Sequence, residues 1–188
     1  MRTITLVLLC VVFAFGAFAQ SAPIVEASGQ YQMLRVNSSR NFPAFTANGG
    51  SGSVAVNFFD YVSGVLEVGV VHNGDIQNYQ INNNWLSYLV GPRFSLRSRA
   101  KKVIPALECL VGGTTVFASG TPQGTNTTLS ANSTGFAMAL GGTLDIRLNK
   151  TVMFRPIQLD YFLTRVNNSY NQNNLRYGAG IVFTFGAQ

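Results

Sequence analysis

Most of the chain alternates between apolar and polar residues with a period of two. Along Val65–His72, for example, the polar Glu67 stands between the apolar Leu66 and Val68. This is the period of a β-strand, because successive strand side chains point to opposite faces of a sheet. The pattern predicts eight strands, over Glu26–Met33, Ser53–Phe58, Val65–His72, Trp85–Arg97, Val103–Phe117, Gly135–Leu148, Val152–Arg165 and Leu175–Phe185.

The segments between these strands alternate in length. Long outer loops and tight periplasmic turns are typical of a bacterial outer-membrane barrel. The sheet has to close, because an open edge in lipid leaves backbone N–H and C=O groups unsatisfied. We therefore predict an all-β fold, an eight-stranded antiparallel up-and-down transmembrane β-barrel with both termini on the periplasmic side. The long segments are Asn37–Asn48, Asn73–Asn84, Ser119–Thr134 and Val166–Asn174, and the short ones are Phe59–Ser63, Ser98–Lys102 and Asn149–Thr151.

Composition and the N-terminus support this interpretation. Charged residues make up only 11% of the chain, against about 25% in soluble domains. Arg2 precedes an apolar run from Ile4 to Phe18, and Ala17-Phe18-Ala19 has the small-x-small pattern of a signal-peptidase site. We expect residues 1–19 to be a signal peptide and residues 20–188 to be the barrel domain, located in the bacterial outer membrane.

Two further features can be predicted along the strands. Arg155 and Pro156 break the alternation of their strand, and a β-bulge at this point would restore it. Aromatic residues gather toward both strand ends, as the two girdles of a membrane barrel require. Trp85 and Tyr177 are expected in the outer belt, with Phe94 and Phe183 in the periplasmic one.

Charged side chains in the middle of strands fall on the polar phase. A charge facing lipid is costly, so these side chains should face the lumen. The interior of an eight-stranded barrel is narrow enough to be filled by side chains, where opposite charges would pair. Arg93 should bridge Glu67 or Glu108, or both, from a neighbouring strand. The predicted lumenal ion-pair residues are Glu67, Arg93, Glu108, Asp145, Arg147, Asp160 and Arg176, and Glu26 shares their phase.

The sequence offers little for catalysis or for ligand binding. The only histidine, His72, is interpreted as a loop-base residue, with Ser87 and Asp75 as the remote alternative of a nucleophile site. There is no metal-spaced set, no phosphate loop and no nucleophile elbow, so we expect no cofactor and no metal. Cys109, alone after the signal, is expected to pack or to face lipid. The basic run from Arg93 to Lys102 is interpreted as a solvated turn, without nucleic-acid binding.

Four stretches resemble a known family. They are Tyr88–Arg97 (YLVGPRFSLR), Gly135–Lys150 (GFAMALGGTLDIRLNK), Arg155–Arg165 (RPIQLDYFLTR) and Asn173–Gly186 (NNLRYGAGIVFTFG). They are similar to the small outer-membrane β-barrel proteins related to the transmembrane domain of outer-membrane protein A. The resemblance implies a barrel without known catalysis that is inserted by the outer-membrane assembly machinery.

Three functions follow from these predictions. The first is a structural outer-membrane protein with surface loops, a side-chain-filled lumen, outer-membrane lipids as partners and a surface ligand that the sequence does not name. The second is a narrow pore for ions or small solutes. The third, a lipid-modifying enzyme, has the weakest support, because it needs a nucleophile and a base within hydrogen-bond reach and His72 beside Asn73-Gly74 is better explained as a loop-base residue.

Overall fold

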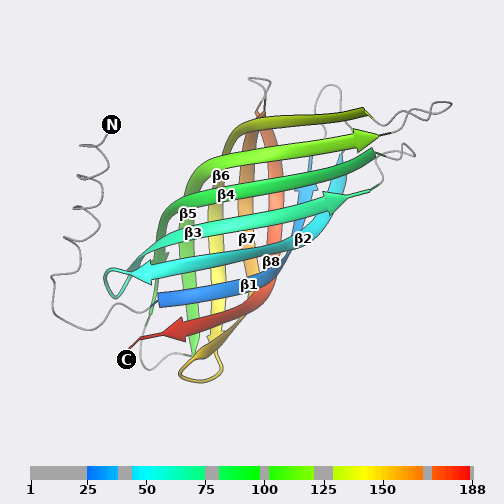
Figure 1. The fold of residues 1–188 in the computed structure, drawn as a ribbon. Helices are drawn as coiled ribbons and strands as arrows, with labels where there is room; N and C mark the ends of the chain where they lie inside the picture. Colours follow the sequence, from blue (N-terminus) through cyan, green and yellow to red (C-terminus); the bar gives the residue numbers. More distant parts are fainter. Residues whose placement is uncertain are drawn as a thin grey trace, which may run out of the picture.

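The computed structural model describes residues 25–37, 44–74, 81–97, 102–120, 129–166 and 171–186. These residues form eight strands in a closed barrel, with each strand antiparallel to its neighbours and β1 paired with β8 (Figure 1). The predicted fold class and barrel closure are confirmed. The strands are β1 (Val25–Val36), β2 (Phe45–Asn57), β3 (Val62–Asn73), β4 (Ile81–Ser95), β5 (Val103–Gly120), β6 (Leu129–Arg147), β7 (Val152–Val166) and β8 (Gln172–Phe185).

The period-two alternation separates the two faces of the barrel wall. In β3, Leu66, Val68 and Val70 are exposed on the outside, while Glu67 is buried in the lumen. The other strands show the same division, so the outer surface is covered by large apolar side chains. Such a surface is stable against lipid and would be costly in water. No helix in the described ranges is long and apolar enough to cross a membrane.

We call the barrel end at which the sequence predicts the surface loops the outer end, and there the strands continue further than the sequence pattern predicts. β5 runs to Gly120 and β6 begins at Leu129, and these two residues are paired. The expected long loop Ser119–Thr134 is therefore partly a hairpin, because backbone pairing continues where apolar alternation stops. The contrast between long and short connections is correspondingly smaller. The β4–β5 connection, residues 96–102, lies at the opposite end, predicted to be periplasmic, and is similar in length to the β3–β4 connection, residues 74–80, at the outer end.

The predicted bulge in β7 is confirmed. The pairing with β8 shifts between Arg155 and Gln158, so Arg155 points into the lumen while Ile157 is exposed outside. The bulge removes Pro156 from the regular ladder, and the Tyr177 hydroxyl donates a hydrogen bond to the Pro156 carbonyl over 2.9 Å. One extra residue thus turns a charge away from the apolar surface.

The predicted position of Trp85 in an outer aromatic belt is wrong. Its side chain is only 7% exposed and lies inside the barrel, where its ring packs edge-on against Phe45 at 6.4 Å. Trp85 shares the inward phase of Ser87 and Arg93, so strand phase outweighs its position near the strand end. Phe94 and Phe183, both predicted in the periplasmic belt, are exposed on the outer face of the wall.

Candidate functional site: the lumen

Two ion pairs in the lumen join residues that lie directly opposite each other on neighbouring strands. Arg93 of β4 is the cross-strand partner of Glu108 of β5, and its Nε lies 2.9 Å from the Glu108 carboxylate. Arg176 of β8 is likewise opposite Asp160 of β7, with Nη2 at 2.7 Å from Oδ2. All four residues are buried. The register of the sheet alone therefore brings these opposite charges together. Neither arginine has to extend across the lumen to find a carboxylate.

Arg93 does not pair with Glu67, the second partner proposed from the sequence. In the β3–β4 ladder Glu67 is opposite Leu89, and Arg93 is opposite Ser63. The four-residue offset between Ser63 and Glu67 corresponds to about 13 Å along a strand, too far for direct pairing. Glu67 and Arg93 are a similar number of residues from their periplasmic turns, but the strand register places them at different heights along the barrel.

The partners of Arg93 and Glu67 lie elsewhere in the barrel. Arg93 has a longer contact with a second carboxylate, at 3.8 Å from Nη1 to Glu26. Glu67 instead forms an ion pair with Arg176, which reaches it from β8. Arg176 therefore lies between two carboxylates, Glu67 and Asp160.

Two further arginines complete the network, and neither is among the ion-pair residues predicted from the sequence. Arg155 forms a fork with Asp145, with its Nε 2.6 Å from Oδ1 and its Nη2 2.9 Å from Oδ2. Arg97, just past the end of β4, contacts Glu26 over 2.8 Å. The predicted bulge implied an inward Arg155, but the sequence pattern assigned it no partner. Arg97 was assigned to a solvated turn. Arg147 was a candidate, but it is only half-buried and forms no ion pair within the described part of the chain.

Gln158 connects the acidic residues across the lumen. Its side-chain nitrogen lies 2.8 Å from a Glu108 oxygen, 3.0 Å from an Asp160 oxygen and 3.3 Å from a Glu67 oxygen. Its carbonyl oxygen accepts a hydrogen bond from Gln30 over 2.8 Å. An amide NH₂ has two hydrogens, so it can serve two of the three carboxylates at one time. We call the residues joined by these contacts, together with the separate Asp145–Arg155 pair, the ion-pair network: Glu26, Glu67, Arg93, Arg97, Glu108, Asp145, Arg155, Gln158, Asp160 and Arg176.

The outer half of the lumen is filled differently, by a cluster of apolar side chains together with uncharged polar ones such as Ser87, Thr164 and Asn174. Sequence reasoning missed this apolar layer, although its members lie on the inward phase of their strands. The Arg176 guanidinium stacks 5.3 Å from the centre of the Phe162 ring, so the two parts of the lumen are in contact. We call Leu34, Val36, Phe45, Val71, Trp85, Leu89, Leu110 and Phe162 the apolar layer.

The residues considered for catalysis are not brought together. His72 is exposed on the outside, where its Nδ1 lies 2.7 Å from the Asn84 side-chain oxygen. Ser87 is buried inside and donates to the Gly69 carbonyl at 3.4 Å. The two side chains are on opposite faces of the wall, and Asp75 lies outside the described residues. Cys109 is exposed on the outer surface.

No metal centre is found among the described residues. No three of their His, Cys, Asp and Glu side chains are arranged to hold a metal ion. The carboxylates of the ion-pair network are instead directed at arginine side chains and at Gln158.

Comparison with known proteins identifies the fold. The sequence matches no family model and no curated protein. Solved structures do match: the attachment invasion locus protein Ail of Yersinia pestis has 15% identity and a TM-score of 0.65, covering 87% of this chain and 99% of its own. The outer membrane protein OprG of Pseudomonas aeruginosa has 15% identity and a TM-score of 0.60, with 89% and 98% covered. Neisserial surface protein A has 13% identity and a TM-score of 0.59, with 87% and 97% covered.

These likenesses show the fold, that of the small eight-stranded outer-membrane barrels, as the resemblance in sequence implied. An outer-membrane location agrees both with these neighbours and with the apolar outer surface. The predicted signal peptide lies outside the described residues.

Proposed function

We propose that this protein is a sealed outer-membrane barrel, a structural element that carries hairpins and loops on the outer surface and conducts no ions. The observation that carries the proposal is the filled lumen. The ion-pair network occupies its periplasmic part and the apolar layer its outer part. The neighbouring structures support the barrel, and the sealed state is an inference from these side chains.

The two parts of the lumen resist ions for different reasons. An ion entering the network has to displace buried pairs, and removing one partner of such a pair typically costs about 3–5 kcal/mol. An ion entering the apolar layer loses hydration against apolar side chains, and the buried Ser87 and Thr164 on the same inward phase carry no charge to replace it. Because the layers follow one another along the barrel axis, any ion has to pass both.

The narrow-pore alternative also has an observation in its favour. Several buried atoms of the network have no protein partner, among them Nη2 of Arg93, Nη1 of Arg155 and Oδ1 of Asp160. Buried polar atoms of this kind commonly bind water. A hydrated periplasmic part of the lumen is therefore compatible with the structure, and the apolar layer would then be the decisive barrier.

Planar-bilayer recordings test the sealed state. The wild-type protein should give no single-channel steps. Arg93→Ala removes one guanidinium from the network, and Trp85→Ala thins the apolar layer. We expect each single variant to stay closed and the double variant to conduct, with circular dichroism confirming that all three remain folded. Regular steps from the wild-type protein would overturn the sealed barrel and favour the pore.

The surface role is supported by the outer hairpin. β6 pairs with β5 from Leu129 onward, but its ladder with β7 begins only at Gly135. The β5–β6 hairpin therefore extends beyond its neighbour on the β7 side, in the position from which it would contact external molecules.

The remaining proposals concern membrane insertion, surface ligands and catalysis. Insertion by the outer-membrane assembly machinery stays part of the proposal, and no surface ligand is assigned. We also propose that the protein is not an enzyme. The separation of His72 from Ser87 across the barrel wall supports this.

A further inference from the structure

Three buried carboxylates of the ion-pair network converge on one amide nitrogen. We call Glu108, Asp160 and Glu67 the acidic triad, and they come from three strands, β5, β7 and β3. One oxygen of each, in that order, lies 2.8, 3.0 and 3.3 Å from the Gln158 side-chain nitrogen. Any two of these oxygens are therefore within about 6 Å of each other, close enough for like charges to disfavour ionisation.

The triad lacks both hydrogens and positive charge if all three acids are ionised. The Gln158 amide has two hydrogens for three carboxylates. Apart from the separate Asp145–Arg155 pair, the network of the described residues joins four acids to only three arginines. These are Glu26, Glu67, Glu108 and Asp160 against Arg93, Arg97 and Arg176. An uncompensated buried charge is costly, so the surplus negative charge calls for a further cation.

The second oxygen of Asp160 is an independent observation at the same place. Its Oδ2 accepts from Arg176, whereas the buried Oδ1 has no hydrogen-bond donor among the described residues. Oδ1 lies against Gly141 of β6, where a Cβ would come within 2.2 Å of it. Gly141 is the cross-strand neighbour of both Glu108 and Asp160, so no side chain separates the two acids on the wall. A buried carboxylate oxygen without a donor is unfavourable, and protonation lowers that cost.

The charges around the triad do not supply the missing cation. Arg147, on the inward phase of β6, is half-buried and lies about 20 Å further along that strand than Gly141. From β2, the uncharged Ser53 stands opposite Glu67. No three acids of the described residues are arranged to hold a metal ion, so a proton is the cation that fits. The remaining lumenal charges are paired, Glu26 with Arg97 and Asp145 with Arg155.

We propose that the acidic triad binds one proton in the folded barrel at neutral pH. The proton belongs to the three carboxyl groups as a unit, because ionisable groups this close titrate together. Folding takes the proton up from solvent, and the triad with Gln158 and the arginines then carries no surplus charge. The folded barrel holds one proton more than the unfolded chain, whose carboxyl groups are ionised above about pH 5. Its stability should therefore fall as the pH rises. The site exists whether or not the lumen conducts.

Infrared spectroscopy of the folded protein in lipid vesicles detects this proton directly. At pH 7 the wild-type protein should show the carbonyl band of an un-ionised carboxyl group, and the band should shift in D₂O. Glu67→Gln and Asp160→Asn each remove one acid and with it the surplus negative charge, so each should abolish the band. The double variant Asp145→Asn/Arg155→Gln is the matched control. It removes a neutral ion pair from the same lumen and should keep the band.

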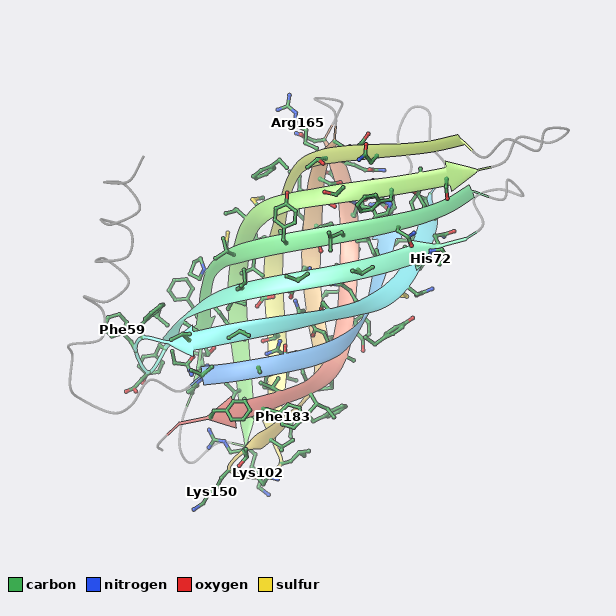
Figure 2. The ribbon with its side chains drawn as sticks, viewed as in Figure 1. Phe59, His72, Lys102, Lys150, Arg165 and Phe183 are labelled. Atoms are coloured by element: carbon green, nitrogen blue, oxygen red, sulfur yellow. The ribbon has the colours of Figure 1, made fainter. Side chains whose placement is uncertain are left out.

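Urea titrations between pH 6 and pH 8 provide the second measurement. The unfolding equilibrium constant of the wild-type protein should rise about tenfold per pH unit, and the two triad variants should lose this dependence. His72 also changes charge near neutral pH as a histidine. Figure 2 shows it near one end of the barrel, opposite the end at which Lys102 and Lys150 lie. It is common to all variants, so its titration cancels from the comparison.

A wild-type spectrum without the band at pH 7 would overturn the proposal, and this result needs no variant to fold. A band that survives in both triad variants would also overturn it, since the proton would then lie elsewhere. Stability that depends on the concentration of Na⁺ or K⁺, without the band, would show a metal cation in place of the proton and contradict the proposal as well.

Discussion

Replacing Arg176 with methionine gives the sharpest test of the ion-pair network. Arg176 is 2% exposed and is the shared partner of two buried carboxylates, Glu67 and Asp160. Methionine keeps much of the side-chain volume but leaves both acids without their cation. Removing one partner of a buried pair costs about 3–5 kcal/mol, and the lost stacking on Phe162 adds about 1 kcal/mol. We expect the free energy of unfolding to fall by about 4–6 kcal/mol.

The protein carries its own probe for this measurement. It has one tryptophan, and Trp85 lies within the apolar layer. Urea titrations of the protein in lipid vesicles, followed by Trp85 emission and by circular dichroism, give the free energy of unfolding when the two signals coincide.

Two control variants separate a missing cation from general damage. Arg35→Met removes an exposed arginine that donates to the Thr46 hydroxyl, and it should cost less than about 1 kcal/mol. The triple variant Arg176→Met/Glu67→Gln/Asp160→Asn removes the cation together with both acids and should recover most of the loss. If Arg176→Met costs no more than Arg35→Met, the network does not hold the lumen together. A triple variant as unstable as the single one would point to lost packing instead of unpaired charge.

Three further outcomes follow from the wall of the barrel. Tyr177→Phe leaves the Pro156 carbonyl without its hydrogen bond and should lower stability by about 1–3 kcal/mol in the same titration; an unchanged midpoint would show that the bulge needs no such partner. Gly141→Ala places a Cβ 2.1 Å from the Leu159 carbonyl oxygen, so it should destabilise the β6–β7 pairing and raise amide hydrogen exchange there; wild-type exchange would contradict the close approach. Trp85 emission should resist quenching by brominated lipid, since the ring is inside the barrel. Strong quenching would show that the Trp85 ring faces the lipid, as the outer-belt prediction required.

The sequence by itself determined the number of strands, the face of each strand and the closure of the sheet. Alternation is a local property, because each residue's face depends only on its position along its own strand. Closure follows from a general requirement, that backbone groups in lipid be paired. Even the bulge at Arg155 could be predicted, since a charge out of phase has to be turned inward.

Tertiary structure alone decided which side chains meet in the lumen. The pairing of Glu67 with Arg176 joins β3 to β8 across the barrel, and it depends on the register of every ladder between them. Counting from the turns placed Glu67 and Arg93 at one height, whereas the β3–β4 register separates them. The apolar layer was missed for a related reason: an inward phase says that a side chain faces the lumen, but the stagger of the strands decides at which depth it meets its neighbours.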